Sequence, residues 1–159
     1  MLLQKRTKFA LAISSTLLLS GAMAAPAMAT TSAPSPKITD AVQTFGNMAT
    51  GSCLDDSNYG LRGFGCNGLD FQKWSIHVWN DGTRQIKNVN TNRCLYDDGV
   101  TLATRPCNST PQQSWWITHH RADSISFQSQ ATNKCLDDSS YGLRTIGCAG
   151  GSNDHQLWR

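Results

Sequence analysis

Hydrophobic and polar residues alternate over short runs along most of the chain. In Trp74-Ser75-Ile76-His77-Val78, every second residue is apolar. Such alternation is typical of β-strands that bury one face. The segment Asn80-Asp81-Gly82-Thr83 follows and predicts a hairpin turn, because Asp-Gly readily adopts positive φ. No segment has a sustained helical period, so the sequence predicts an all-β fold.

The large apolar positions recur every 41 residues. The recurring sets are Phe45, Ile86 and Phe127; Leu54, Leu95 and Leu136; Leu61, Leu102 and Leu143; and Trp74 and Trp115, matched by Trp158 after a two-residue insertion. A fixed period of this length indicates one supersecondary unit used three times around a shared core. A propeller usually needs at least four blades, so three copies favour a closed threefold arrangement.

The six cysteines follow the same period. Cys53, Cys94 and Cys135 are each followed 13 residues later by Cys66, Cys107 and Cys148. If the units are equivalent, each pair closes a disulfide within its own unit. Each bond then stabilises the fold by about 3 kcal/mol in the chain-entropy model. Zinc binding has less support, because no C-x-x-C pair occurs. We expect no metal and no cofactor.

The N-terminus predicts an export signal over residues 1–29. Lys5, Arg6 and Lys8 precede an apolar stretch that is too short to span a bilayer, and a small-x-small site ends at Ala29. The alternative is a retained membrane anchor. Residues 30–39 are predicted to form a polar linker, and 40–159 the folded domain. A secreted, extracellular protein with no membrane insertion agrees with a disulfide framework.

The formal net charge of +3 comes from basic residues within the predicted export signal. Three of the 14 basic residues lie in residues 1–29, whereas all 11 acidic residues follow them. The rest of the chain therefore has 11 residues of each sign. Nucleic acids and anionic membranes both attract basic proteins, so this balance argues against either as the main partner.

Three motifs together resemble the ricin-type (R-type) lectin family. They are a Cys-Leu opening, followed by aspartate in units one and three; a second cysteine 13 residues later; and the endings Gln72-Lys73-Trp74, Gln113-Ser114-Trp115 and Gln156-Leu157-Trp158. The resemblance covers about residues 40–159. It implies a β-trefoil fold of twelve strands, four from each unit, with pseudo-threefold symmetry. It also implies carbohydrate binding, with glycans or polysaccharide as the partner.

The resemblance also implies where a sugar binds. Such lectins place a carboxylate after Cys-Leu, an aromatic residue two positions before the second cysteine, and amides near Gln-x-Trp. The matching candidates are Asp55, Phe64, Asn67 and Gln72 in unit one, with Tyr59 as a second aromatic, and Asp137, Tyr141 and Gln156 in unit three. In unit two, Tyr96 and Arg105 replace the carboxylate and the aromatic residue, so this pocket is predicted to be silent or altered. A vestigial loop is the alternative interpretation for unit one.

Two further sets have structural interpretations. Asp56, Asp97 and Asp138 directly precede a loop in each unit, and we expect each to cap its own backbone turn. Arg62 and Arg144 recur in Gly-Leu-Arg, where they either border a pocket or pair with nearby aspartates. The tryptophans and glutamines of Gln-x-Trp are expected to seal the core and to hold nearby loops.

Catalytic motifs are absent from the sequence. It contains no G-x-S-x-G, H-E-x-x-H or P-loop, so we expect a protein that is not an enzyme. His119-His120 breaks the repeat symmetry and is interpreted either as a metal or catalytic pair or as a polar hairpin tip. The rival function is a protein-binding β-trefoil, such as a secreted protease inhibitor or adhesion factor, because one fold supports many functions.

The repeat predicts the disulfide map. Proteolysis without reduction, followed by mass spectrometry, should give linked peptides only within units: Cys53 with Cys66, Cys94 with Cys107, and Cys135 with Cys148. A peptide that links cysteines of two different units would contradict the repeat.

Overall fold

The structure is a computed structural model, and it describes residues 40–159. The predicted export signal (1–29) and linker (30–39) lie outside the described residues and stay predictions. Within residues 40–159 there are eleven strands and three single-turn 3-10 helices, and the paired strands are antiparallel. The all-β prediction is therefore confirmed.

Repeats 1 and 2 share one order of elements: a strand, a two-stranded hairpin, a 3-10 helix and a closing strand. Repeat 3 has the same order up to its 3-10 helix. Repeat 1 contains β1 (Ala41–Gln43), β2 (Ser52–Ser57), β3 (Gly60–Gly65), η1 (Asp70–Gln72) and β4 (Trp74–Val78). Repeat 2 contains β5 (Arg84–Asn88), β6 (Arg93–Asp97), β7 (Leu102–Pro106), η2 (Pro111–Gln113) and β8 (Trp115–His119). Repeat 3 contains β9 (Ile125–Ser129), β10 (Cys135–Ser139), β11 (Gly142–Ile146) and η3 (Asp154–Gln156).

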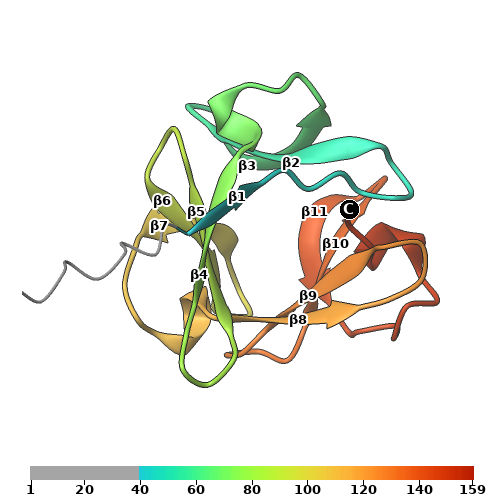
Figure 1. Cartoon of the computed structure of the whole chain (residues 1–159). Helices are drawn as coiled ribbons and strands as arrows, with labels where there is room; N and C mark the ends of the chain where they lie inside the picture. The colour runs from blue at the N-terminus through green and yellow to red at the C-terminus, as the bar shows by residue number, and fades with distance from the viewer. Residues whose placement is uncertain (1–39) are drawn as a thin grey trace, which may run out of the picture. The chain divides into compact units, whose positions relative to one another are not determined.

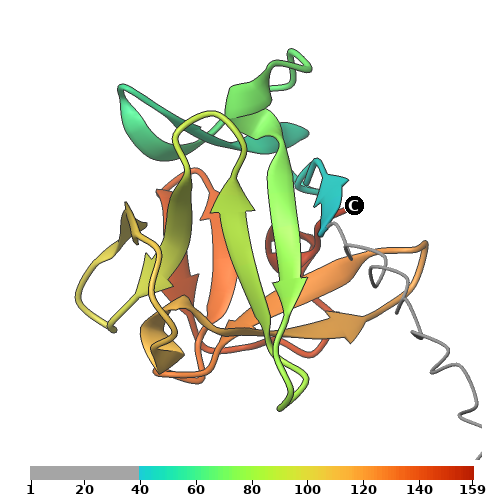
Figure 2. The same cartoon turned by 60° about the vertical axis from the view of Figure 1, so that its left-hand side comes forward.

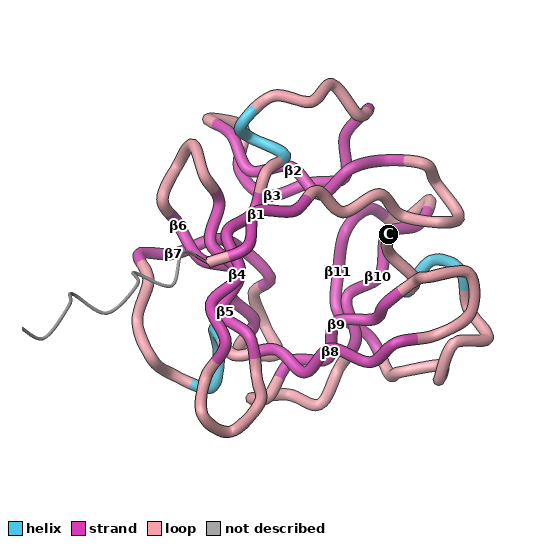
Figure 3. The backbone as a smooth tube through the Cα atoms, in the orientation of Figure 1, coloured by secondary structure: helices cyan, strands magenta, loops and turns pink. Residues whose placement is uncertain are grey.

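Two sets of strands build the β-trefoil. The barrel strands β1, β4, β5, β8 and β9 pair in that order around a common centre. Each repeat adds one cap hairpin to these strands: β2–β3, β6–β7 or β10–β11 (Figures 1 and 3). β4 and β5 form the hairpin predicted around Asp81-Gly82, seen as adjacent green strands in Figure 2. Gly82 has a φ of 89° in this turn, and the Asp81 carboxylate accepts the Thr83 N–H at 2.9 Å.

Trp158 and Arg159 occupy the place where the expected twelfth strand would begin. Trp158 forms isolated bridges with Asn47 and Ile125, on the same pattern by which β4 and β8 begin. Arg159 and Gly46 then exchange two backbone hydrogen bonds, at 2.7 and 3.0 Å.

The core consists of the predicted threefold sets. Phe45, Ile86 and Phe127 are buried, as are the three tryptophans and Leu54, Leu95 and Leu136. The second leucine set, Leu61, Leu102 and Leu143, is only partly buried against this core. The rings of Phe45 and Phe127 meet edge to face, with their centroids 4.8 Å apart. Complete burial of one such side chain contributes about 1.5–3 kcal/mol, so no single repeat holds enough of this surface to fold alone.

Each tryptophan of Gln-x-Trp is hydrogen-bonded as well as packed. The indole N–H groups of Trp74, Trp115 and Trp158 donate to the carbonyls of Leu54, Leu95 and Leu136, at 3.0, 3.2 and 3.3 Å. Each bond joins the end of a repeat to its own cap hairpin. The tryptophans therefore have the structural role expected of them, since a buried indole N–H needs an acceptor.

Each glutamine of Gln-x-Trp holds the backbone on both sides of the second cysteine. The Gln113 amide donates to Pro106 O at 2.9 Å and accepts from Asn108 N at 2.7 Å, so it brackets Cys107. Gln72 and Gln156 bracket Cys66 and Cys148 in the same way. All three cysteine pairs are closed within their own repeats, as predicted.

The recurring second aspartates connect neighbouring repeats. Asp56 of repeat 1 accepts hydrogen bonds from Thr91 and, at 2.8 Å, from Thr104, both in repeat 2. Asp97 of repeat 2 accepts from Thr132 and, at 3.0 Å, from Thr145, both in repeat 3. These contacts explain why the aspartates are buried.

Asp138 of repeat 3 closes the cycle by accepting from Thr50 of repeat 1 at 2.6 Å. The second threonine is replaced here by Gly63, where a Cβ atom would lie 2.6 Å from the Asp138 carboxylate. The expectation that each aspartate mainly caps its own turn is therefore wrong. Only Asp97 also accepts a nearby backbone N–H, that of Gly99 at 3.1 Å, among the hydrogen bonds of the described residues.

Replacing these aspartates should reduce stability in proportion to the number of donors that each aspartate binds. Asp56 is also ion-paired with Arg93 (2.6 Å), so Asp56→Ala should lower the free energy of unfolding by about 3–5 kcal/mol. Asp97→Ala should cost about 2–3 kcal/mol and Asp138→Ala about 1–2 kcal/mol. Chemical denaturation measures the order. Exposed Asp70→Ala is the control and should change stability by less than about 0.5 kcal/mol; equal losses for all four variants would contradict the role of the inter-repeat bonds.

Removal of a bracketing glutamine should also destabilise the fold. Gln113→Ala leaves Pro106 O and Asn108 N without partners, and we expect a loss of about 2–3 kcal/mol in urea denaturation. The matched control is Gln112→Ala in the same 3-10 helix, because Gln112 makes no side-chain hydrogen bond within the described residues. Similar losses for the two variants would show that the bracket contributes nothing.

Candidate functional site

The β2–β3 cap hairpin brings the main candidates of repeat 1 together. Asp55 in β2 lies directly opposite Arg62 in β3, and Cys53 lies opposite Phe64. Tyr59 lies in the turn between the two strands, where its N–H donates to the Ser57 hydroxyl at 3.2 Å. Opposite charges on directly paired residues of antiparallel strands attract, which favours the Asp55–Arg62 contact.

The Asp55 carboxylate is enclosed by protein groups. Arg62 Nε donates to one oxygen at 3.1 Å, and Gln72 Nε2 donates to the other at 3.3 Å. Asp55 is only 2% exposed, whereas the Arg62 side chain is 32% exposed. The polar group that repeat 1 presents to solvent is therefore the guanidinium rather than the carboxylate.

The Arg62 guanidinium also lies against two aromatic rings. Its central carbon is 4.1 Å from the centroid of the Phe64 ring and 5.0 Å from that of Tyr59. Tyr59 is 84% exposed and Phe64 is 44% exposed, so both rings keep open surface. Exposed aromatic rings can stack on the apolar face of a sugar, and a guanidinium on a ring is held in one plane by the cation–π attraction.

Repeat 3 reproduces most of this arrangement. Arg144 Nε donates to the enclosed Asp137 carboxylate at 3.2 Å, and its guanidinium lies 4.8 Å from the centroid of the exposed Tyr141 ring. The amide of Asn153 reaches Asp137 at 3.5 Å. The small hollow beside Arg144 has a volume of about 260 Å³ and extends over the neighbouring hairpin of repeat 2 to Leu102.

Repeat 2 has different chemistry. Tyr96 occupies the place of the enclosed aspartate, and its hydroxyl donates to Asp98 at 3.0 Å. This bond raises the pKa of Tyr96, and the pKa of Asp98 is lowered mainly by the backbone N–H groups of Thr101 and Val100. Arg105 lies 5.9 Å from the centroid of the Tyr96 ring. No enclosed carboxylate holds Arg105 within the described residues.

The other predicted site residues have mainly structural contacts. Asn67 is exposed; its N–H donates to Gln72, and its side chain accepts from Leu69 N at 3.0 Å. Gln156 bonds to Gly147 O and Ala149 N, so the amide beside Asp137 is that of Asn153. The structure thus groups Asp55, Tyr59, Phe64 and Gln72 in repeat 1, and Asp137 and Tyr141 in repeat 3.

Sequence reasoning did not include Arg62 and Arg144 among the binding candidates. The signal for them lies in the hairpin register. When Cys53 and Cys66 form a disulfide across a hairpin, the strand residues between them pair, which brings Asp55 opposite Arg62. The predicted pairing with a nearby aspartate is confirmed for both arginines, and Arg144 also lines the small hollow of about 260 Å³.

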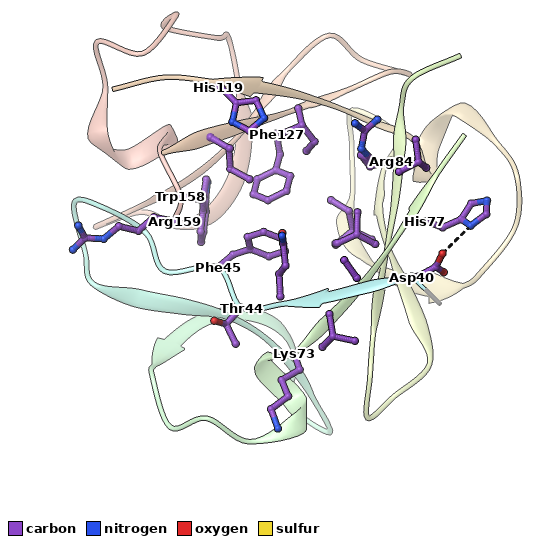
Figure 4. Close-up of a pocket in the computed structure, with 18 of the residues that line it drawn as sticks. Asp40, Thr44, Phe45, Lys73, His77, Arg84, His119, Phe127, Trp158 and Arg159 are labelled. Atoms are coloured by element: carbon purple, nitrogen blue, oxygen red, sulfur yellow. Dashed lines mark hydrogen bonds and ion pairs between the residues drawn. The ribbon is translucent and has the colours of Figure 1, made fainter. Parts of the chain in front are cut away.

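A cavity lies at the barrel, away from both cap sites. It has a volume of about 1310 Å³, and residues of β1 are part of its lining. Figure 4 shows the Phe45 and Phe127 rings facing this cavity, with His77 bonded to Asp40 at 3.2 Å on its rim. None of the eight predicted sugar-binding residues lines it.

Residues 40–159 contain no group of three or more side chains arranged to hold a metal ion. His120 instead contacts the Ser126 hydroxyl at 2.9 Å. No helix of the described residues is long and apolar enough to cross a membrane.

Comparison with solved structures identifies the same fold in other proteins. The designed threefold-symmetric protein ThreeFoil has a TM-score of 0.68 at 15% identity, covering 74% of this chain and 96% of ThreeFoil. The exo-β-1,3-galactanase 1,3Gal43A from Clostridium thermocellum scores 0.67 at 22% identity, covering 78% of this chain. The hemolytic lectin CEL-III scores 0.64 at 21% identity, covering 76% of this chain. This chain spans only 30% of each of the last two proteins.

Among curated proteins, no relative matches the chain. A protein-family model does match it. Residues 70–145 fit the ricin-type β-trefoil lectin domain-like family. The resemblance expected from the sequence is therefore confirmed: residues 70–145 are ricin-type lectin-like, within described residues that have the β-trefoil fold.

Proposed function

We propose that this protein is a secreted, non-enzymatic carbohydrate-binding protein that acts through the cap hairpins of repeats 1 and 3. The observation that carries the proposal is the exposed aromatic surface of these hairpins. Tyr59 and Phe64 in repeat 1, and Tyr141 in repeat 3, each lie against an arginine that is anchored on an enclosed aspartate.

The proposed binding mode combines stacking with hydrogen bonds. The apolar C–H face of a pyranose packs against Tyr59 or Tyr141, and the neighbouring guanidinium donates to ring substituents. Asp55 and Asp137 then act by fixing the arginines, because their own oxygens are covered. The ricin-type match and the fold shared with CEL-III, a hemolytic lectin, support a carbohydrate ligand.

Affinity in this mode depends on using both sites. A shallow site for one sugar typically binds at about millimolar concentration, or about −4 kcal/mol. Two sites on one rigid body can strengthen attachment to a polymer by about 10²- to 10⁴-fold, if both engage the same polymer. We therefore expect weak binding of free monosaccharides and stronger binding to polysaccharides or surfaces coated with glycans.

Removing both exposed tyrosines tests this function. On a glycan array, Tyr59→Ala/Tyr141→Ala should reduce retention on the preferred glycan at least 10-fold, and each single variant should lose most of the gain from double attachment. The melting temperature should stay nearly constant, because the two side chains are 84% and 80% exposed.

Trp116→Ala removes a partly exposed aromatic side chain in β8, outside the cap hairpins, and is the matched control. It should leave retention unchanged. If the tyrosine double variant binds glycans as well as the parent protein, the site assignment is wrong. If the protein binds no glycan but inhibits or captures a protease independently of sugar, the rival protein-binding function holds instead.

A further inference from the structure

The arginines of repeats 1 and 3 determine which chemical groups of a ligand can be recognised. We infer that Arg62 and Arg144 bind the anionic groups of acidic glycans, carboxylate or sulfate, so that acidic sugars are the ligand class. This inference rests on the proposed function, and it concerns the same two sites.

The first step is the burial of the carboxylates. Asp55 and Asp137 are 2% and 1% exposed, and each is bonded to the Nε of its arginine. A sugar hydroxyl that donates a hydrogen bond to a carboxylate needs that carboxylate to be accessible, and these two are covered. The ligand therefore meets a hydrogen-bond donor with positive charge.

The second step concerns the unused donors of the arginines. Each guanidinium uses Nε for its aspartate, and the Nη groups of Arg62 and Arg144 have no acceptor within the described residues. The side chains are 32% and 38% exposed, so these donors are accessible to solvent. A guanidinium with two free N–H groups side by side suits planar carboxylates and sulfate-like anions, which it binds through paired, charge-assisted bonds.

The third step is the fixed position of the two guanidinium groups. Arg62 lies on Phe64 and Tyr59, and Arg144 lies on Tyr141, while the aspartates hold the other edge of each group. A side chain held at both its edge and its face loses less conformational entropy when it binds a ligand. An acidic sugar can thus stack on the tyrosine while its anionic group pairs with the Nη edge.

Other arginines within residues 40–159 are not held between an enclosed aspartate and an exposed aromatic ring. Arg93 uses both Nε and Nη2 on Asp56 and also donates to Ser57 O, so it forms part of the inter-repeat contact. In repeat 2, Arg105 lies near Tyr96, whose hydroxyl is bonded to the exposed carboxylate of Asp98. A negative charge at this place repels an anionic ligand.

The test is a glycan array that contains neutral oligosaccharides and their uronate, sialylated and sulfated counterparts. The parent protein should bind the acidic members at least 10-fold more strongly than the matched neutral ones, with binding weakened by salt. The uronate and sialylated arms report on carboxylate recognition, and the sulfated arm reports on sulfate. Arg62→Gln/Arg144→Gln should abolish the preference for acidic members.

Arg93→Gln is the matched control, because it removes one arginine from a buried aspartate without touching an aromatic surface. It should keep the preference for acidic glycans. If the glutamine double variant fails to fold, Arg62→Lys/Arg144→Lys keeps the charge but lacks the paired donors, and it should lose the preference while remaining folded by circular dichroism.

Each outcome separates the inference from the proposed function. Equal binding of neutral and acidic glycans, or a preference unchanged in the Arg62/Arg144 variants, overturns the inference and leaves carbohydrate binding intact. If Arg93→Gln loses the preference for acidic glycans to the same extent, the preference comes from nonspecific attraction of charge, and the inference is overturned as well. Absence of binding to every glycan refutes both the inference and the proposed function.

Discussion

Strand alternation places two neighbouring aspartates on opposite sides of the same cap hairpin, and the rest of the molecule depends on this division. In β2, Asp55 contacts Arg62 of its own hairpin, and Asp56 contacts threonines of repeat 2. β10 repeats the division with Asp137 and Asp138. Successive side chains of a strand point to opposite faces. The first aspartate of the motif therefore binds an arginine at the surface, and the second forms the hydrogen bonds between repeats.

The hydrogen bonds between repeats explain how three small units form one fold. Each unit is too short to bury a sufficient core, and the shared apolar centre brings the units together without fixing their register. The buried carboxylates fix this register, because each needs hydrogen-bond donors at defined positions. Asp56, Asp97 and Asp138 each accept from the next repeat around the cycle, which couples the three hairpins.

Symmetry is broken in places that bear on function. Repeat 2 keeps the inter-repeat aspartate, Asp97, but has Tyr96 where its neighbours have the arginine-anchoring aspartate. The scaffold and the proposed binding surface can therefore change independently, since the two positions point in opposite directions.

The sequence by itself determined the fold, because the repeat is visible in the spacing of its apolar residues and cysteines. The 41-residue period, the cysteine pairs and the apolar sets specify three equivalent hairpins around one core, and the disulfides and buried residues agree with them. It also indicated where the candidate site lies, through Asp55, Tyr59 and Phe64 on one hairpin.

Which polar group faces solvent was decided only by the tertiary structure. The exposure of Arg62 and the enclosure of Asp55 depend on cross-strand register and on Gln72 arriving from a later segment. Likewise, the partners of Asp56 lie 35 and 48 residues away in the next repeat, and local sequence contains no signal for contacts that form only when the repeats pack together.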